Sequence, residues 1–397
     1  MHLVTMNVGV PRETYPDERR VALAPVGVSA LAKAGASVVV EHDAGQQAGF
    51  PDSLYEAHGA TIASDRAQIF TTANVILQVR GLGANPDAGQ ADLELFQSGQ
   101  IVLGLLDPLG APEAAQELAG RNVTSFALEL LPRVSRAQPM DVLSAMATIA
   151  GYKAVLMAAD TLPRMFPMMI TAAGTITPAR VLIVGAGVAG LQAIASARRL
   201  GAVVQAYDVR PAVKEQVESL GARFVELELD TEESETEGGY AQAMGEEFYR
   251  RQRELMGRVV AESDVVITTA AVPGGKAPIL LTEEMVNGMD EGAVIVDLAA
   301  ESGGNCELTQ PGKNVNVSGV TIMGPANVAS TIPFHASQMY SKNVTAFVEN
   351  LVKDGEVRMD LDDPIIHDAL LTHEGQVFNA RVRERLGLTA SDEGSNA

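Results

Sequence analysis

The sequence is poor in several residue types, and each shortage excludes a class of protein. It has no tryptophan and one cysteine, Cys306, so a disulfide within the chain is excluded. Lysine and arginine number 29 against 50 aspartate and glutamate residues, and the formal net charge is −21 at pH 7. A surface this negative repels nucleic-acid phosphates and anionic lipid headgroups. We therefore expect no nucleic-acid partner.

The sequence also lacks the signals of membrane, secreted and metal-binding proteins. No uninterrupted run of 18 apolar residues is present, so we expect no direct membrane span. The most apolar stretch, residues 142–159, contains polar residues and glycine and is typical of a buried helix. Residues 1–10 lack the basic and apolar regions of a secretion signal. The six histidines have no metal-ligand spacing, so we expect no metal site in a cytoplasmic α/β protein.

Two stretches of the 397-residue chain have the pattern of a strand, a helix and a second strand. In the later stretch, residues 180–184 and 203–207 are short β-branched strands, and residues 191–200 between them have a helical period. Residues 7–43 have the same outline. Further strands are predicted at residues 74–79, 101–105, 123–128, 265–269 and 293–298. This alternation predicts two Rossmann-like, doubly wound parallel-sheet domains.

Long helices are expected to join these two domains, over residues 140–162 and 332–352. The second helix would return the chain, so that the last ~50 residues pack on the first domain. We therefore expect a first domain over residues 1–143 and 335–397, and a dinucleotide-binding domain over residues 144–334.

Residues 185–190 match the G-x-G-x-x-G pattern, with glycine at positions 185, 187 and 190. A predicted strand precedes the pattern and a predicted helix follows it, as dinucleotide binding requires. Asp208 ends the next strand, 18 residues after Gly190. Its carboxylate can accept both ribose hydroxyls and would repel a 2′-phosphate, which favours NAD(H) over NADP(H). Arg210, two residues further on, is the one feature that points toward NADP(H).

Polar segments elsewhere leave alternatives open. Arg133, Gln138 and Asp141 lie within nine residues and could orient a nicotinamide carboxamide, but Asp141 could equally cap the following helix, and the residues alone favour the cap. Residues 272–278 follow a predicted strand and fit either a dinucleotide crevice or a surface turn. Residues 226–237 hold seven acids in twelve positions and fit either a solvated loop or a lid.

Taken together, these segments resemble the NAD(H)-binding α1 subunit (domain I) of proton-translocating NAD(P)+ transhydrogenases, in the alanine dehydrogenase/transhydrogenase superfamily. The segment over residues 135–141 is the most specific match. The matching segments are residues 10–13, 18–25, 133–141, 184–190, 207–210, 238–241, 268–274 and 297–306.

This resemblance implies how the protein works. Members of that family are homodimers of two-domain chains, with NAD(H) in the cleft between the domains. Hydride passes directly to NADP+ on a partner subunit, and proton flow through membrane-embedded subunits drives the reaction. The resemblance thus implies an enzyme that is cytoplasmic and peripheral to the inner membrane through those partners. Transfer between two nicotinamides needs no general base, so holding one ring in place and excluding water suffice.

The resemblance also assigns residues, and it reverses the preference for a mere cap at Asp141. Catalytic roles fall on Arg133, Gln138, Asp141 and Ser144. Cofactor contacts fall on Arg133, Val134, Ser135, Gln138, Pro139, Met140, Asp141, Gly185, Ala186, Gly187, Val188, Gly190, Asp208, Val209, Arg210, Gly239, Tyr240, Gln252 and Ala271.

Two alternatives differ in the residues they require. Alanine dehydrogenases use an arginine, a lysine and a histidine of the first domain, and these positions correspond to Arg20, Arg80 and Asp107 here. Because arginine cannot lose its proton and aspartate is ordinarily ionised, we expect the amino-acid site to be lost. A non-catalytic NAD-binding protein would keep the glycine pattern but would not need residues 133–141.

Overall fold

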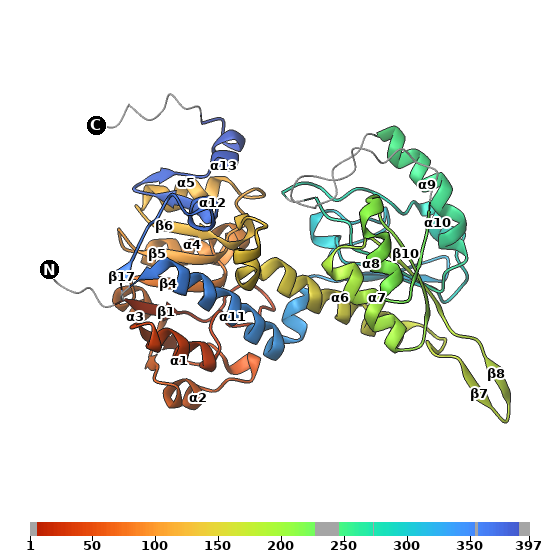
Figure 1. Ribbon diagram of the computed structural model, residues 1–397, viewed down its shortest axis with the longest axis horizontal. Coiled ribbons are helices and arrows are strands. Elements are labelled where there is room, and N and C mark those ends of the chain that lie inside the picture. The colour runs from red at the N-terminus through yellow and green to blue at the C-terminus, as the bar shows by residue number, and fades with distance from the viewer. Residues whose placement is uncertain (1–5, 227–245, 273, 354–355, 389–397) are drawn as a thin grey trace. The chain divides into compact units, whose positions relative to one another are not determined.

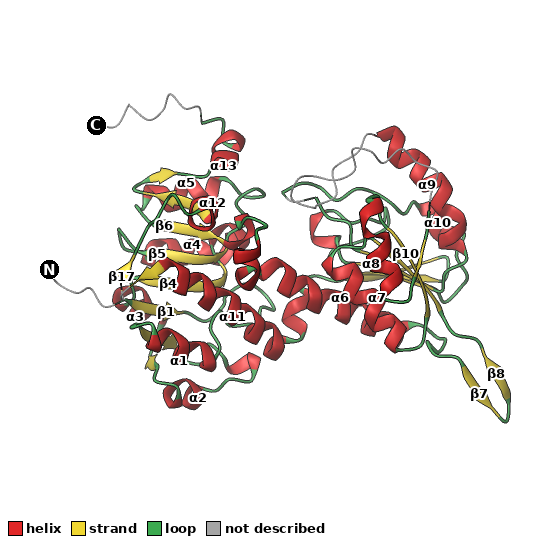
Figure 2. Cartoon of the chain, in the orientation of Figure 1, coloured by secondary structure: helices red, strands yellow, loops and turns green. Residues whose placement is uncertain are grey.

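The computed structural model describes residues 6–226, 246–272, 274–353 and 356–388 of the chain. The chain divides into two compact units, Met1–Met146 with Ala329–Ala397, and Ala147–Val328 (Figures 1 and 2). The boundaries expected from the sequence lie three residues before the first of these divisions and six after the second. The first division falls inside a helix. A sequence pattern indicates where a helix begins, but not at which residue it leaves one hydrophobic core and joins the next.

The first unit is built on an eight-stranded sheet with the order β19-β18-β6-β5-β4-β1-β2-β3. The six strands from β6 to the edge strand β3 are parallel and doubly wound, as predicted. The C-terminal strands β18 and β19 extend the sheet in antiparallel fashion, so the end of the chain packs on the first unit, as expected. The strands are β1 Asn7–Val10, β2 Ser37–Glu41, β3 Thr61–Ala63, β4 Val75–Arg80, β5 Ile101–Leu105, β6 Thr124–Ala127, β18 Leu370–His373 and β19 Gln376–Val377.

Helices cover this sheet, and the long return helix α11 contributes most to the core. Its apolar residues Tyr340, Val344, Phe347 and Leu351 recur at helical spacing and are fully buried. Also in this unit, β16 Val352–Lys353 pairs with β17 Glu356–Val357. The helices are α1 Pro25–Lys33, α2 Asp52–Ala57, α3 Arg66–Thr72, α4 Pro86–Leu95, α5 Glu113–Gly120, α11 Pro333–Leu351, α12 Pro364–Ala369 and α13 Ala380–Arg385.

The second unit has a seven-stranded sheet with the order β11-β10-β9-β12-β13-β15-β14. Its first six strands repeat the parallel order of the first unit, and only β14 is antiparallel. Strand order reverses between β9 and β12, which is where doubly wound sheets bind ligands. The strands are β9 Arg180–Val184, β10 Val203–Tyr207, β11 Arg223–Phe224, β12 Val265–Thr268, β13 Val294–Asp297, β14 Lys313–Val317 and β15 Val320–Gly324.

Two helices of the second unit, α6 and α7, were predicted from the sequence, and both begin close to their predicted positions. Helix α7 starts at Val188, three residues earlier than expected, because it continues directly from the glycine turn. A hairpin of β7 Met169–Thr171 and β8 Gly174–Ile176 extends from this unit (Figure 1). The helices are α6 Val142–Thr161, which begins in the first unit, α7 Val188–Arg199, α8 Lys214–Ser219, α9 Glu246–Ala261 and α10 Glu283–Asn287.

Helix α6 is long and apolar enough to cross a membrane by length and composition, and it is the one such helix among the described residues. Core helices of water-soluble proteins pass the same test. One face of α6 contributes Ala154, Val155 and Ala158 to the core of the second unit, while Tyr152 and Asp160 are exposed. We therefore interpret α6 as a core helix, as the sequence predicted.

Candidate functional site

The turn between β9 and α7 has the shape that a dinucleotide requires. Gly185 has a φ of +99°, a conformation that favours glycine. A Cβ atom on Gly190 would lie 1.8 Å from the carbonyl oxygen of Gly185, so only glycine lets the helix pack on the turn. A Cβ atom on Gly187 would meet no described atom within 4 Å. The three glycines therefore supply a tight turn, an open backbone and close packing, the three roles of the dinucleotide pattern.

The N-terminus of α7 faces this turn without a side-chain cap among the described residues. Gly187 is the N-cap residue and makes no capping hydrogen bond, and the first turn contains no acidic residue. The free N–H groups and the positive end of the helix dipole would stabilise a pyrophosphate. Val188 is partly exposed there, whereas Ala186 is buried in the core of the unit.

Asp208 follows β10 beside the same turn, as predicted, but its carboxylate is already bound. Oδ2 accepts a hydrogen bond from the Ala186 N–H at 2.7 Å. The guanidinium of Arg210 makes a two-pronged contact, from Nε to Oδ1 at 2.9 Å and from Nη2 to Oδ2 at 3.0 Å. Both side chains are buried, and the intervening Val209 packs against the core. The sequence predicted the position of Asp208 but not this ion pair.

The loop after β12 lies across the point of strand-order reversal and carries Ala271, which is exposed. The Asn305 side chain holds both ends of this loop. Its Oδ1 accepts from the Ala270 N–H at 3.0 Å, and its Nδ2 donates to the carbonyl oxygens of Ala270 at 2.9 Å and Pro278 at 2.8 Å. The loop therefore has a fixed backbone where it leaves and rejoins the domain.

Asp297, at the end of β13, in turn holds Asn305. Its fully buried carboxylate accepts the Asn305 N–H at 2.7 Å. Sequence reasoning missed both residues as members of the site, although residues 297–306 were recognised as a matching segment. An acidic residue that ends a buried strand was the signal available. The other donors to this carboxylate are Thr268 Oγ1, Ala299 N, Cys306 N and Thr309 Oγ1.

Gln252 lies on α9 and is fully buried. Its Nε2 donates to the hydroxyl of Tyr207 at 2.9 Å, and its Oε1 has no hydrogen-bond partner in the described portion of the chain. Gln252 therefore contacts the side chain of Tyr207, the residue before Asp208. Gly239 and Tyr240 lie outside the described residues, as does the acidic stretch from residue 227 that was considered as a lid.

In the first unit, residues 133–141 form an ordered segment that includes the 3-10 helix Ser135–Met140. Helix α6 consequently begins at Val142, two residues later than predicted. Asp141 stands between the two helices and caps α6, because its carboxylate accepts the N–H of Ser144 at 2.9 Å and the hydroxyl of Ser144 at 2.6 Å. The cap that the residues alone favoured is thus present.

This segment is anchored on α11, while several of its side chains are exposed. Met140 is buried in the core, and the Asn343 side chain donates to the Pro139 carbonyl at 2.7 Å. Arg136 forms an ion pair with Asp363. The anchored backbone leaves five side chains of the segment exposed besides Arg136, namely those of Arg133, Val134, Ser135, Gln138 and Pro139.

The positions that correspond to an amino-acid site in alanine dehydrogenases also lie in the first unit. Arg20 is buried and binds Glu18 through Nε at 2.7 Å and Nη2 at 2.6 Å. Arg80 lies 3.4 Å from the same carboxylate and stacks on the ring of Tyr15. Both guanidinium groups therefore contact an internal carboxylate, which is the group that a substrate carboxylate would have to replace.

Two half-buried glutamates of the first unit accept hydrogen bonds from the backbone at strand ends. Glu13 accepts the N–H groups of Val79 and Arg80, and burial raises its pKa to about 8. Glu129 accepts the N–H groups of Leu106 and Asp107, and burial raises its pKa to about 7. Burial also raises the pKa of Asp107.

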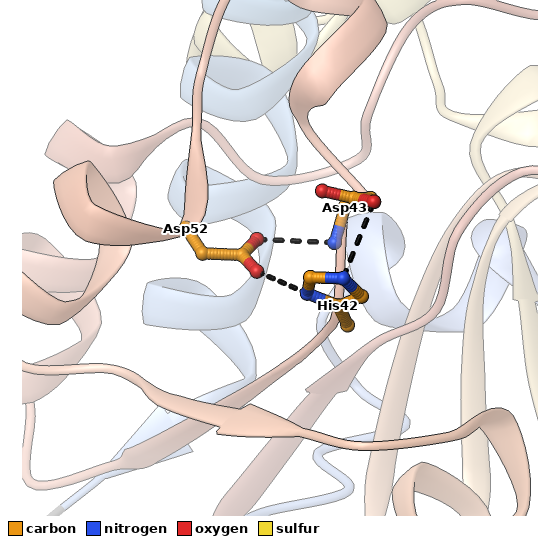
Figure 3. A group of neighbouring side chains, drawn as sticks. All are labelled: His42, Asp43 and Asp52. Atoms are coloured by element: carbon orange, nitrogen blue, oxygen red, sulfur yellow. Dashed lines mark hydrogen bonds and ion pairs between the residues drawn. The ribbon is translucent and has the colours of Figure 1, made fainter.

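A separate cluster joins His42, Asp43 and Asp52 on the surface of the first unit (Figure 3). Nδ1 of His42 lies 2.5 Å from Asp52, and Nε2 lies 3.3 Å from Asp43. The hydrogen bond that His42 donates to the Asp52 carboxylate is the main cause of a raised His42 pKa. Since the two ring nitrogens face different carboxylates, we interpret the cluster as an ion-pair network.

These features define a class of protein. The chain combines two doubly wound α/β domains of the same strand order, and the second has a dinucleotide-type glycine turn at its point of strand-order reversal. Residues 9–150 match the N-terminal domain of the alanine dehydrogenase/PNT family, and residues 154–380 match its C-terminal domain. The chain belongs to this family, as the resemblance indicated.

Within the family, the chain is more similar to transhydrogenases than to the alanine dehydrogenase compared. It is 45% identical to the first part of NAD(P) transhydrogenase subunit alpha of Rhodospirillum rubrum, over 94% of this chain and 98% of that protein. The crystal structure of transhydrogenase from Sinorhizobium meliloti matches with 43% identity and a TM-score of 0.81, covering 94% of this chain and 99% of that chain. Alanine dehydrogenase of Bacillus subtilis is 29% identical, over 96% of this chain and 95% of that protein.

Proposed function

We propose that this chain is the NAD(H)-binding component of a proton-translocating transhydrogenase. In this role, hydride passes directly between its NAD(H) and NADP(H) held on a partner subunit. The observation that carries the proposal is the glycine turn at residues 185–190, whose three glycines each meet a separate requirement of dinucleotide binding. The 45% identity to the alpha-subunit protein of R. rubrum over nearly the whole chain supports transhydrogenation as the reaction.

The second unit supplies most of the affinity in this proposal. The α7 N-terminus at Gly187 and Val188 binds the pyrophosphate, and Asp208 binds the adenosine ribose. Gln252 contributes indirectly, through its hydrogen bond to the Tyr207 hydroxyl. Ala271 contacts the cofactor from the loop that Asn305 holds. NAD(H) itself supplies the hydride chemistry when it is bound.

In this proposal, residues 133–141 position the nicotinamide ring and transfer no proton. The guanidinium of Arg133 and the amide of Gln138 are exposed groups suited to a carboxamide, which has both a donor and an acceptor. Asp141 and Ser144 hold the segment in place through the helix cap. Because Asn343 anchors this segment, its backbone is already held in place when the reaction begins.

Partner subunits follow from the relatives, because a protein named as the first part of an alpha subunit implies further transhydrogenase subunits. We place the membrane-embedded and NADP(H)-binding functions on those partners, and this chain on the cytoplasmic side of the inner membrane. The hairpin β7–β8 exposes Met168 and Ile170, the latter by 78%, and exposed apolar residues on a protruding hairpin fit an interface. We assign this hairpin to a homodimer contact.

An alanine dehydrogenase activity is the alternative, and the first unit disfavours it. A substrate carboxylate would have to break the buried contact between Arg20 and Glu18, and separating such a pair is costly. The direct test is titration of the chain with NADH and NADPH by calorimetry. We expect binding of NADH and far weaker binding of NADPH, and no reduction of NAD+ with L-alanine. Equal affinities, or alanine-dependent reduction, would overturn the proposal.

A further inference from the structure

The ion pair between Asp208 and Arg210 carries a consequence for cofactor selection. The Asp208 carboxylate accepts four hydrogen bonds, from the N–H groups of Ala186 and Arg210 and from Nε and Nη2 of Arg210. A carboxylate offers about four lone-pair positions. Every position is therefore filled, and a ribose diol needs two of them.

Only two of these four bonds come from a mobile group. The N–H of Ala186 belongs to the glycine turn, which is fastened to β10 because Gly185 N donates to the Tyr207 carbonyl at 2.8 Å. The Arg210 N–H is also a backbone group. A ribose that binds Asp208 therefore displaces the Arg210 guanidinium, and the two compete for the same oxygens.

The displaced guanidinium stays close to the ribose, because its own backbone remains bound to Asp208. Arginine is well suited to bind phosphate in a two-pronged manner, and an arginine near the ribose is the usual ligand of a 2′-phosphate. In this chain the charge of Arg210 is balanced by Asp208, whose side chain is 5% exposed. A 2′-phosphate would gain the arginine only by approaching that carboxylate.

We infer that Arg210 is a specificity-determining residue, a latent ligand for a 2′-phosphate that Asp208 keeps occupied. Asp208 thus selects NAD(H) in two ways, by binding the diol and by holding the arginine. The inference rests on the proposed binding of NAD(H) by the second unit. It predicts that removing the charge of Asp208 does more than weaken NADH binding, since it also releases Arg210 for NADPH.

The test measures dissociation constants for NADH and NADPH by fluorescence on the full chain and three variants. Asp208→Asn keeps the shape of the side chain and removes its charge, and should improve NADPH binding about tenfold or more while weakening NADH binding by a similar factor. Adding Arg210→Gln to this variant should abolish the gain for NADPH. If the gain persists in the double variant, loss of repulsion alone explains it and the role of Arg210 is wrong.

Arg210→Gln alone provides a second, independent test, which remains informative even if Asp208→Asn does not fold. Because the competitor is removed, NADH binding should tighten about threefold, with no gain for NADPH. A tenfold weakening of NADH binding would overturn the inference, since Arg210 would then be a direct ligand of NAD(H). If the unmodified chain binds neither cofactor, the proposed function itself fails. If it binds NADH but the variants do not follow this pattern, only the inference fails.

Discussion

The side-chain amide of Asn305 pairs with the backbone of Ala270, donating to its carbonyl at 2.9 Å and accepting its N–H at 3.0 Å. The preceding residue, Thr269, donates its hydroxyl to the Gly185 carbonyl at 3.0 Å. Asn305 therefore fixes the loop after β12 against the glycine turn. Thr269 thus joins the loop to the glycine turn, and the buried amide of Asn305 holds the residue that follows Thr269.

Replacement of this amide tests its contribution. Asn305→Ala leaves the N–H of Ala270 and the carbonyls of Ala270 and Pro278 without this partner, and each buried group left unsatisfied costs about 1–3 kcal/mol. We expect a lower free energy of unfolding in urea and weaker NADH binding. Asn316→Ala, at an exposed position of β14, is the matched control and should change neither. An Asn305→Ala protein with unchanged NADH affinity would contradict the role given to this loop.

The two glycines at the start of α7 should respond differently to the same substitution. Gly190→Ala places a Cβ 1.8 Å from the Gly185 carbonyl, so both the fold of the turn and NADH binding should suffer. Gly187→Ala meets no described atom within 4 Å and should leave the melting temperature nearly unchanged while it weakens NADH binding. Thermal unfolding and calorimetry on both variants separate the two effects. Equal loss of stability in both would show that Gly187 is not an open position.

The segment over residues 133–141 should affect transfer more than binding. Gln138→Asn shortens the side chain by one methylene and keeps its amide, so the nicotinamide would be displaced by ~1 Å. Such a displacement can slow transfer by ~10²-fold. We expect a near-normal NADH dissociation constant and a single-turnover rate to NADP+ that is lower by about that factor. An unchanged rate together with lost binding would make the segment a binding element only.

Glu129 should make the stability of the protein depend on pH. Its carboxyl ionises near pH 4.5 in the unfolded chain, whereas burial raises its pKa to about 7 in the folded protein. Between these values the folded state binds more protons, so stability falls as pH rises, by at most ~1.4 kcal/mol per pH unit. Glu129→Gln should flatten this slope between pH 5 and 7, measured by urea unfolding. Glu56→Gln, at an exposed position of the same unit, should leave the slope intact.

The sequence was most informative where local patterns decide the structure. The apolar run at residues 101–105 predicted β5 with its observed bounds, and the glycine pattern correctly predicted the turn between β9 and α7. Glycine spacing carries this information because each glycine meets a steric requirement inside a six-residue segment. Asp208 was placed beside the turn by a different pattern, its position at the end of the next predicted strand, 18 residues after Gly190.

What the sequence did not reveal depends on contacts between distant segments. Asn305 and Ala270 are 35 positions apart, and nothing near either residue indicates that they pair. The strands β18 and β19 were not predicted, because they are short and join the sheet only beside β6. The raised pKa of Glu129 likewise follows from burial by the whole first unit. Even the pairing of Asp208 with Arg210, only two residues apart, depends on side-chain conformation.

Direct hydride transfer from NADH on this chain to NADP+ on a partner is the defining step of the proposed function. An isotope experiment follows it, in which the chain is mixed with an NADP(H)-binding transhydrogenase subunit, NADP+ and NADH carrying deuterium at C4 of the nicotinamide. We expect the label to appear in NADPH without exchange with solvent, because no protein group handles the hydride. No transfer of label, together with formation of pyruvate from L-alanine and NAD+, would contradict it.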